Sequence, residues 1–353
     1  MSSKLLIITQ VMDTDHPILG FFVRWVLEFS KHAESVTVIC LQEGKHDLPE
    51  NVRVYTLGKR PGQRVGVRDR LLFLWRFYRL IIAHRHEYDH VFVHIIQLYI
   101  LLGYPVWRLL GKRMGLWYAH GAVSLSIRIA TKLARVVFTA SPESLRIESK
   151  KKMVIGHGID TKHFAPTQTQ KDIDLITIGR ISPAKHLDLL VDLLEEVRKS
   201  HNVSLTIIGA PNTGADHLYE RELKEKIAKR GLDAYVHLLG PVPHRELPPY
   251  LNRARVFVHA ATTGSLDKAL LEPMACGVPI VTNAPGAVSL PLENWYIADR
   301  TDMRQFADTV ATTLSNDTTP RTQVLRRYVE EHHSVESLVT KIVAWYKNDQ
   351  RDP

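Results

Sequence analysis

The chain has 353 residues, of which 45% are hydrophobic and 24% charged, and its formal net charge is +9. This length exceeds a typical single core and predicts two domains, and the composition is ordinary for a soluble globular protein. The two cysteines, Cys40 and Cys276, are isolated in the sequence, which excludes a disulfide framework and a thiolate metal site. They indicate a reducing compartment, so we expect a cytoplasmic protein.

The positive charge is concentrated in the first part of the chain. Residues 1–165 hold 24 Lys and Arg against 13 Asp and Glu, whereas the remainder holds 22 against 24. Between residues 59 and 85, arginines alternate with apolar residues such as Leu71 and Trp75. This mixture fits peripheral contact with an anionic membrane on its cytoplasmic face, although a solvated helix with one buried face has a similar composition. No nucleic-acid motif accompanies the charge, so nucleic acid is not an expected partner.

The start of the chain predicts a parallel sheet built from alternating strands and helices. The apolar run at 5–8 meets Asp13 and Asp15 too soon for a secretory signal. The run from Val91 to Trp107 is interrupted by polar residues, glycine and proline, and falls short of the about 20 apolar residues of a membrane span. It predicts a buried strand followed by a helix. The strand-like runs of this first series are 5–9, 36–41, 52–57, 90–94, 114–118, 136–139 and 153–156.

A second series of strand-like runs follows a polar connector at 160–172. We therefore predict a first domain over 1–165, a second over 166–333, and a helical segment over 334–353. Both domains are expected to be α/β with parallel sheets. The second series comprises 175–179, 204–209, 236–240, 256–259 and 279–282.

The segment 264–279, GSLDKALLEPMACGVP, predicts a helix start that could bind an anion. Gly264 and Ser265 favour a tight turn, and an apolar run then contains the carboxylate of Glu272. A helix N-terminus exposes unpaired amides and a partial positive charge, so it suits phosphate. A carboxylate further along the helix can accept hydrogen bonds from sugar hydroxyls. Together these features indicate a nucleotide-sugar site, although a solvated glutamate is the commoner reading of Glu272 taken alone.

The segment 174–190, DLITIGRISPAKHLDLL, predicts a strand, a loop and a helix. Gly179 ends the strand, Arg180 follows it, and Lys185 precedes the helical run. An arginine supplies a planar fork of donors and a lysine a compact charge, so the pair fits a diphosphate. An exposed loop pair is the structural alternative.

The two segments together resemble the retaining, nucleotide-sugar-dependent glycosyltransferases of family four, also called glycosyl transferases group 1. The resemblance covers the whole chain and is strongest over 174–286. It implies the GT-B fold, in which two facing doubly wound, Rossmann-like domains leave a cleft between them. It also implies that the second domain holds the donor, the first holds the acceptor, and the segment 334–353 packs back on the first domain.

The resemblance implies a donor site whose residues come from the second domain. Arg180, Lys185 and amides near the start of the 264–275 helix would stabilise the leaving diphosphate, so no metal and no cofactor beyond the nucleotide-sugar co-substrate is expected. The family's first motif glutamate is replaced by Gly264, and we hypothesise that Asp267 takes over its contact with the sugar. The predicted donor-binding residues are Gly179, Arg180, Lys185, Gly209, Val242, Gly264, Ser265, Leu266, Asp267, Lys268 and Glu272.

The resemblance also implies an acceptor site on the first domain. His120, in the context Tyr118-Ala119-His120-Gly121, matches a histidine that the family places near the acceptor and the donor sugar. We predict that His120, Arg180 and Lys185 are catalytic, and that Gly20, Phe21, Arg24 and His120 bind the acceptor.

The predicted function is transfer of a hexose-type sugar, with retention, from a UDP- or GDP-type donor to a hydroxyl of a glycan or lipid-linked acceptor in polysaccharide biosynthesis. Two alternatives stay open. Gly264 favours a GT-B partner subunit that binds nucleotide without catalysis, and another GT-B enzyme, such as a phosphorylase or a sugar-nucleotide epimerase, is the other alternative.

Overall fold

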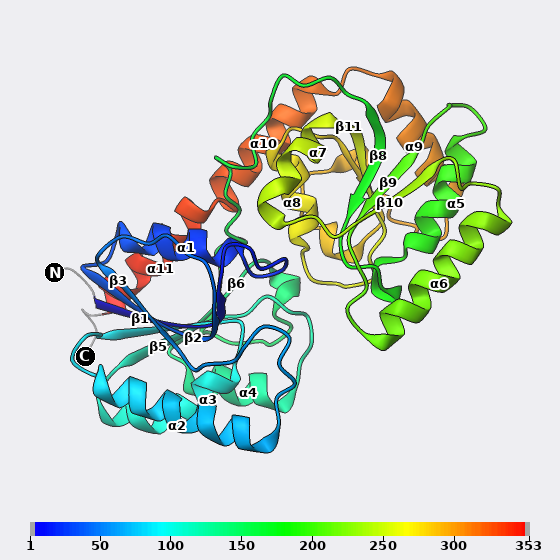
Figure 1. Cartoon of the computed structure of the whole chain (residues 1–353). Coiled ribbons are helices and arrows are strands. Elements are labelled where there is room, and N and C mark those ends of the chain that lie inside the picture. Colours follow the sequence, from blue (N-terminus) through cyan, green and yellow to red (C-terminus); the bar gives the residue numbers. More distant parts are fainter. Residues whose placement is uncertain (1–3, 350–353) are drawn as a thin grey trace. The chain divides into compact units, whose positions relative to one another are not determined.

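The computed structural model describes residues 4–349, and these form two compact α/β units. The first unit includes the chain up to Gly158 together with the segment from Ser334 onward, and the second spans Ile159–His333 (Figure 1). The division lies before the predicted boundary at 165/166. The reason is packing, because Ile159 and Phe164 are buried in the hydrophobic core of the second unit.

The first unit contains a parallel sheet of seven strands within the described residues, in the order β3-β2-β1-β4-β5-β6-β7. The register is continuous, with Leu5 opposite both Val36 and His90. The predicted strands agree with these elements to within a few residues. They are β1 (Lys4–Met12), β2 (Ser35–Glu43), β3 (Val52–Thr56), β4 (His90–His94), β5 (Arg113–Trp117), β6 (Val136–Thr139) and β7 (Lys152–Val154).

Helices cover both faces of the first sheet (Figure 1). The core on one face includes α1 (Phe21–Ser30) and α11 (Val335–Asp349), and the core on the other face includes α2 (Val67–Ala83), α3 (Leu98–Leu109) and α4 (Leu125–Leu133). Thus the last helix packs in the first unit, where Tyr346 Oη donates a buried hydrogen bond of 2.7 Å to Val91 O. As predicted, the apolar run at 91–107 forms strand β4 and helix α3. Between residues 4 and 349, no helix is long and apolar enough to cross a bilayer.

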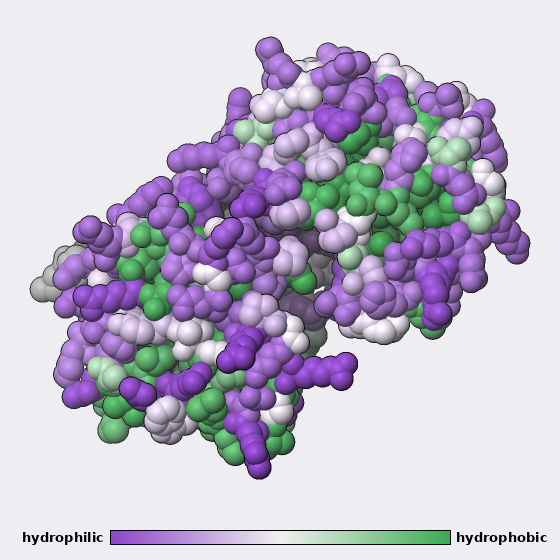
Figure 2. Space-filling view, in the orientation of Figure 1, coloured by the Kyte–Doolittle hydropathy of each residue, from purple (hydrophilic) through white to green (hydrophobic). Residues whose placement is uncertain are grey.

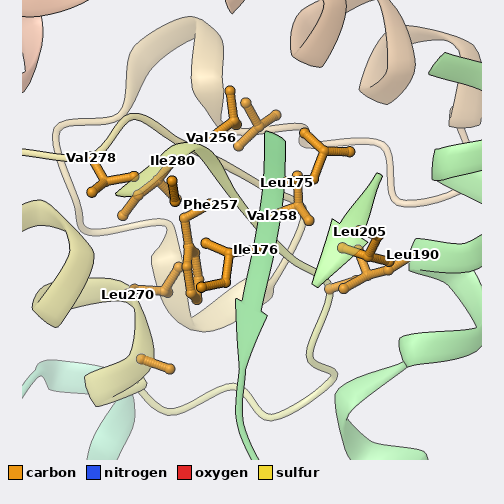
Figure 3. Close-up of a cluster of buried hydrophobic side chains, with 14 of the residues drawn as sticks. Leu175, Ile176, Leu190, Leu205, Val256, Phe257, Val258, Leu270, Val278 and Ile280 are labelled. Carbon is orange, nitrogen blue, oxygen red and sulfur yellow. The ribbon is translucent and has the colours of Figure 1, made fainter. Parts of the chain in front are cut away.

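The second unit contains a parallel sheet of five strands within the described residues, in the order β10-β9-β8-β11-β12. Its buried side chains, including Leu175 and Phe257 of the central strands, form one continuous core (Figure 3). The strands are β8 (Ile173–Ile178), β9 (Leu205–Ile208), β10 (Val236–Gly240), β11 (Ala254–His259) and β12 (Ile280–Thr282). The helices are α5 (Leu187–Val197), α6 (Gly214–Lys229), α7 (Leu247–Arg253), α8 (Lys268–Ala275), α9 (Met303–Ser315) and α10 (Thr319–His332).

The short helix α8 begins at Lys268, four residues after the predicted start at Gly264, because residues 264–267 form a loop and a cap. Asp267 is its N-cap, and its Oδ1 accepts a hydrogen bond of 3.1 Å from Ala269 N–H. At the other end, Gly277 has a φ of +70°, a left-handed conformation that glycine adopts without strain, and the chain then enters β12.

Candidate donor and acceptor sites

Three glycines end the strands β8, β9 and β10 at the carboxyl edge of the second sheet. Gly179 N–H donates to Ile208 O at 2.9 Å, and Gly209 N–H donates to Gly240 O at 2.9 Å. A Cβ on Gly209 would lie 1.9 Å from Gly179 O, so the loops that follow β8 and β9 approach more closely than a side chain permits. This edge is where open α/β sheets bind their ligands.

Arg180 and Lys185 both lie at this edge, in different environments. The Arg180 side chain is 48% exposed, and its Nε lies 3.8 Å from Asp216 Oδ2. Lys185 ends a short 3-10 helix, η2 (Pro183–Lys185), and its Nζ bonds Asp267 Oδ2. The next residue, His186, has a φ of +45°, a conformation that costs a non-glycine residue strain. The loop therefore holds Lys185 against the start of α8 while Arg180 faces solvent.

Asp267 is the counter-ion of Lys185 in this structure. Burial would raise the pKa of its carboxyl, but Lys185 and His259 hold that pKa well below its ordinary value. The carboxylate is thus committed to a cation and to a helix cap. The hypothesis that Asp267 contacts the donor sugar in place of the missing glutamate stays a prediction.

The loop before α8 is packed tightly against the loop that follows β12. A Cβ on Gly286 would lie 2.2 Å from Ser265 O, so this close approach requires glycine. Gly264 and Ser265 are half-buried, whereas the Leu266 side chain is buried at 3% exposure. Leu266 can therefore serve a ligand only through its main chain.

Glu272 is buried one turn into α8, at 5% exposure, and its Oε1 lies 2.7 Å from His244 Nε2. His244 belongs to η3 (His244–Glu246), in the segment that follows β10, and Val242 of the same segment packs against the core. Lys268 lies four residues before Glu272. Burial lowers the pKa of Lys268 to about 7, and the Glu272 carboxylate opposes that lowering.

On the first unit, Gly20 and Phe21 lie where α1 begins. Gly20 is the N-cap, and a Cβ there would lie 2.7 Å from the carbonyl oxygens of Thr14 and His16, so the loop before α1 requires a glycine. The half-buried Phe21 ring lies 6.0 Å from the His94 ring.

Arg24, predicted to bind the acceptor, is paired with two carboxylates in this structure. Its guanidinium bonds Glu28 Oε2 and Glu336 Oε1, each at 2.9 Å. It ties α1 to α11 and is occupied by two carboxylates, which sequence spacing could not reveal because Glu336 lies 312 residues away.

His120 lies in the loop that follows β5 and is exposed. Its Nδ1 accepts a hydrogen bond of 3.3 Å from Ala122 N–H. The imidazole is thus accessible at the carboxyl edge of the first sheet, and its role at the acceptor stays a prediction.

Three histidines at strand ends or in the following loops were not predicted as site residues. His94 ends β4 and stacks on Phe22 with ring centroids 3.8 Å apart, and its Nδ1 lies 3.2 Å from Thr9 Oγ1. His259 ends β11, and His244 follows β10. A signal for them existed, because a polar residue at the carboxyl end of an apolar strand points to a ligand-binding edge.

The carboxyl edge of the second unit therefore has the features of a site for a diphosphate with attached hydroxyls. Two cations lie at one edge with a helix N-terminus and a buried carboxylate on the same helix. Among residues 4–349, no group of three or more His, Cys, Asp or Glu side chains is placed to hold a metal ion. The chain thus has two Rossmann-like units, and the second has a ligand-binding edge of this kind. This is the architecture of the GT-B glycosyltransferase fold.

The chain belongs to the glycosyl transferases group 1 family, because the sequence profile of that family matches residues 158–350. It is 33% identical over 147 residues to the lipopolysaccharide core biosynthesis mannosyltransferase LpsB of Rhizobium meliloti, covering 38% of this chain and 41% of that protein. It is 27% identical over 181 residues to the GPI3 subunit of the phosphatidylinositol N-acetylglucosaminyltransferase of Saccharomyces cerevisiae. This match covers 50% of this chain and 37% of that protein. These matches span less than half of either relative.

Solved structures show the same fold at low sequence identity. HepE of Anabaena, crystallised in complex with UDP, is similar with a TM-score of 0.77 and 18% identity over 98% of this chain and 100% of that chain. Sucrose-phosphate synthase of Thermosynechococcus elongatus is similar with a TM-score of 0.73 and 16% identity. The match covers 99% of this chain and 100% of that chain.

Proposed function

We propose that the protein is a retaining glycosyltransferase that moves a hexose-type sugar from a UDP- or GDP-type donor to a hydroxyl of a glycan or lipid-linked acceptor. The observation that carries the proposal is the gathering of Arg180, Lys185, the start of α8 and the buried Glu272 at one sheet edge. The names of the relatives support it, since one is a mannosyltransferase and another belongs to a phosphatidylinositol N-acetylglucosaminyltransferase.

The chemistry follows from where charge develops. When the bond between the anomeric carbon and the diphosphate breaks, negative charge grows on the leaving group. Lys185, Arg180 and the amides that open α8 stabilise that charge without rearranging, which is a large source of catalysis. We propose that these protein cations, rather than a resident metal ion, neutralise the diphosphate. Glu272 accepts hydrogen bonds from donor hydroxyls, and His120 orients the acceptor.

Nucleotide binding tests the proposal first. One nucleotide among UDP, GDP, ADP, CMP and dTDP, together with its sugars, is expected to raise the melting temperature, because a ligand at about 100 times its dissociation constant adds about 2.7 kcal/mol of stability. Arg180→Ala and Glu272→Ala should lose the shift, whereas Arg304→Ala, an exposed arginine of α9, should keep it. If no nucleotide shifts the wild-type melting curve, the donor site is absent and the proposal fails.

A nucleotide-binding partner subunit without catalysis is the second candidate, and Gly264 is the observation that favours it. Both candidate functions predict that the protein binds a sugar nucleotide, but only the enzyme is expected to turn it over. Release of nucleotide from the bound sugar nucleotide in the presence of a lipid or glycan acceptor supports the enzyme, whereas tight binding without release across acceptors supports the partner subunit.

We also propose that the first unit contacts an anionic membrane at the cytoplasmic face through α2. The helix buries Phe73, Phe77 and Ile81, yet its opposite side exposes Leu71 at 62% and Trp75 at 57%. Hydrophobic side chains also reach the surface among hydrophilic ones over the part of the unit where α2, α3 and α4 lie (Figure 2). The exposed apolar residues of these helices are Val67, Leu71, Leu72, Trp75, Ile82, Leu98, Leu109, Leu125 and Ile129.

Charge on α2 favours a lipid surface over an apolar protein partner. Arg68, Arg70 and Arg79 are exposed on the same helix, and the Arg79 guanidinium lies 5.3 Å from the centre of the Trp75 ring. Arginines beside an exposed aromatic ring are typical of an interfacial helix on anionic lipid.

Membrane contact through α2 is expected to weaken when its apolar side is removed. In sedimentation with phosphatidylglycerol vesicles, Leu71→Ser together with Trp75→Ser should reduce binding roughly tenfold or more, because each side chain contributes about 1.5–3 kcal/mol on burial. Binding of the wild type should also fall as salt rises. Leu218→Ser, on an exposed leucine of the second unit, is the matched control. Equal binding by the double variant and this control would contradict the proposal.

A further inference from the structure

A buried histidine, His259, lies behind the ion pair between Lys185 and Asp267. Its side chain ends β11 and is 2% exposed. Its Nε2 lies 3.6 Å from Asp267 Oδ2, the same oxygen that bonds Lys185 Nζ. One carboxylate oxygen therefore faces two nitrogen groups that come from different elements, and in this structure the lysine is the closer of the two.

The other ring nitrogen of His259 has a partner that suits both charge states. His259 Nδ1 lies 3.3 Å from Thr282 Oγ1, which also accepts a hydrogen bond of 3.1 Å from Ala284 N–H. A hydroxyl can donate to a neutral imidazole or accept from an imidazolium. Thr282 can thus remain bonded to His259 when the ring gains a proton.

The charges around His259 oppose one another. Burial lowers the pKa of His259, the Asp267 carboxylate raises it, and the Lys185 ammonium lowers it further. If Lys185 turns toward an anion, its effect on the histidine weakens while that of Asp267 remains. The pKa of His259 must then rise. At the same time a half-buried carboxylate that loses its cation is destabilised, so a second cation beside Asp267 is favoured.

We propose that His259 is a positioning residue that takes up a proton from solvent as Lys185 turns from Asp267 to the diphosphate of the donor. The proton adds to the nitrogen of the His259 ring that carries no hydrogen. No covalent bond of the nucleotide sugar breaks, and Asp267 keeps a positive partner throughout. This role rests on the proposed function, because it needs a diphosphate at the start of α8. It explains why this chain has a histidine, an aspartate and a lysine together at one sheet edge.

The sign of the pH dependence follows from the direction of the shift. A group whose pKa is higher in the complex takes up a proton on binding, so affinity rises as the pH falls toward the pKa of the free protein and is constant above the pKa of the complex. Lys268, near the start of the same helix, also changes charge near neutral pH and favours anion binding at lower pH. The test must therefore remove the histidine alone.

Calorimetric titration of the full chain with UDP-glucose and GDP-mannose tests this coupling, because the diphosphate of both probes keeps a constant charge over the range studied. From about pH 8 to about pH 6, wild-type affinity should rise by up to about tenfold per pH unit more than that of His259→Gln. In two buffers of different ionisation enthalpy, the wild type should take up more protons than His259→Gln. His237→Gln, an exposed histidine of β10, should match the wild type. Equal slopes and equal proton uptake in wild type and His259→Gln would overturn the role.

A titration without nucleotide provides the second readout. In NMR spectra of the labelled full chain, the pKa of the His259 ring should be higher in Lys185→Ala than in the wild type, with His259→Gln identifying the signal. An unchanged titration would overturn the coupling of His259 to Lys185. Failure of the wild type to bind any sugar nucleotide would instead contradict the proposed function, so the two failures are distinguishable.

Discussion

Lys185→Ala is expected to lower kcat/KM for the sugar nucleotide by at least about 100-fold, the typical effect of removing one preorganised donor from a developing negative charge. The substitution has two consequences at this edge of the sheet. It removes an ammonium group held at the start of α8, and it leaves the Asp267 carboxylate near the diphosphate without the lysine. Loss of attraction and gain of repulsion act in the same direction. The measurement is steady-state kinetics with the sugar nucleotide that stabilises the wild type.

The same reasoning predicts a partial rescue. In Lys185→Ala combined with Asp267→Asn, the negative charge near the diphosphate is gone, so part of the lost activity should return even though the lysine is still absent. Lys199→Ala is the matched control, because Lys199 is an exposed lysine paired with Glu196 in the same unit. A loss of less than threefold for Lys185→Ala, similar to that of the control, would remove Lys185 from the donor site.

Gly209→Ala is expected to destabilise the second unit by about 3 kcal/mol, since both steric overlap and backbone strain contribute at the level of about 1–3 kcal/mol each. The added Cβ would lie 1.9 Å from Gly179 O, and the φ of +153° is one that side chains rarely adopt. The backbone has little freedom to move away, because Gly209 N–H bonds Gly240 O. Displacement of Gly179 would also move Arg180 and weaken nucleotide binding.

Gly231→Ala separates the two causes. Gly231 has a φ of +66° but no atom within 4 Å of the added Cβ, so only the backbone penalty of about 1 kcal/mol is expected. The free energies of unfolding come from urea titrations in which the transitions of the two units are fitted separately. Equal losses in the two variants would show that β8 and β9 do not need their close approach.

The sequence determined the type and order of the elements. Runs such as His90–His94 and Val236–Gly240 are apolar segments bounded by turn residues, and they form strands with the predicted bounds. For α8 the sequence placed the start at Gly264, whereas the helix begins after Asp267, whose side chain caps it, and ends before Gly277. The family resemblance rested on the same kind of local spacing.

Contacts between residues that are far apart in the sequence could not be predicted from local spacing. Arg24 resembles a free cation at a helix start, yet Glu336 from the last helix occupies it. Asp267 resembles a substitute for a missing sugar ligand, yet Lys185, 82 residues away, is bonded to it. The domain boundary was placed late because Ile159 and Phe164 lie beside or within the polar connector, and only their burial assigns them to the second core.

By itself, the sequence therefore determined that this is a two-unit α/β protein with two cations, a helix start and a glutamate suited to a nucleotide sugar. Only the tertiary structure decided which of those charges are already paired, and that a buried histidine lies behind one pair. The physical reason is that strand and helix formation depends on neighbours along the chain, whereas the charge state and orientation of a side chain depend on neighbours in space.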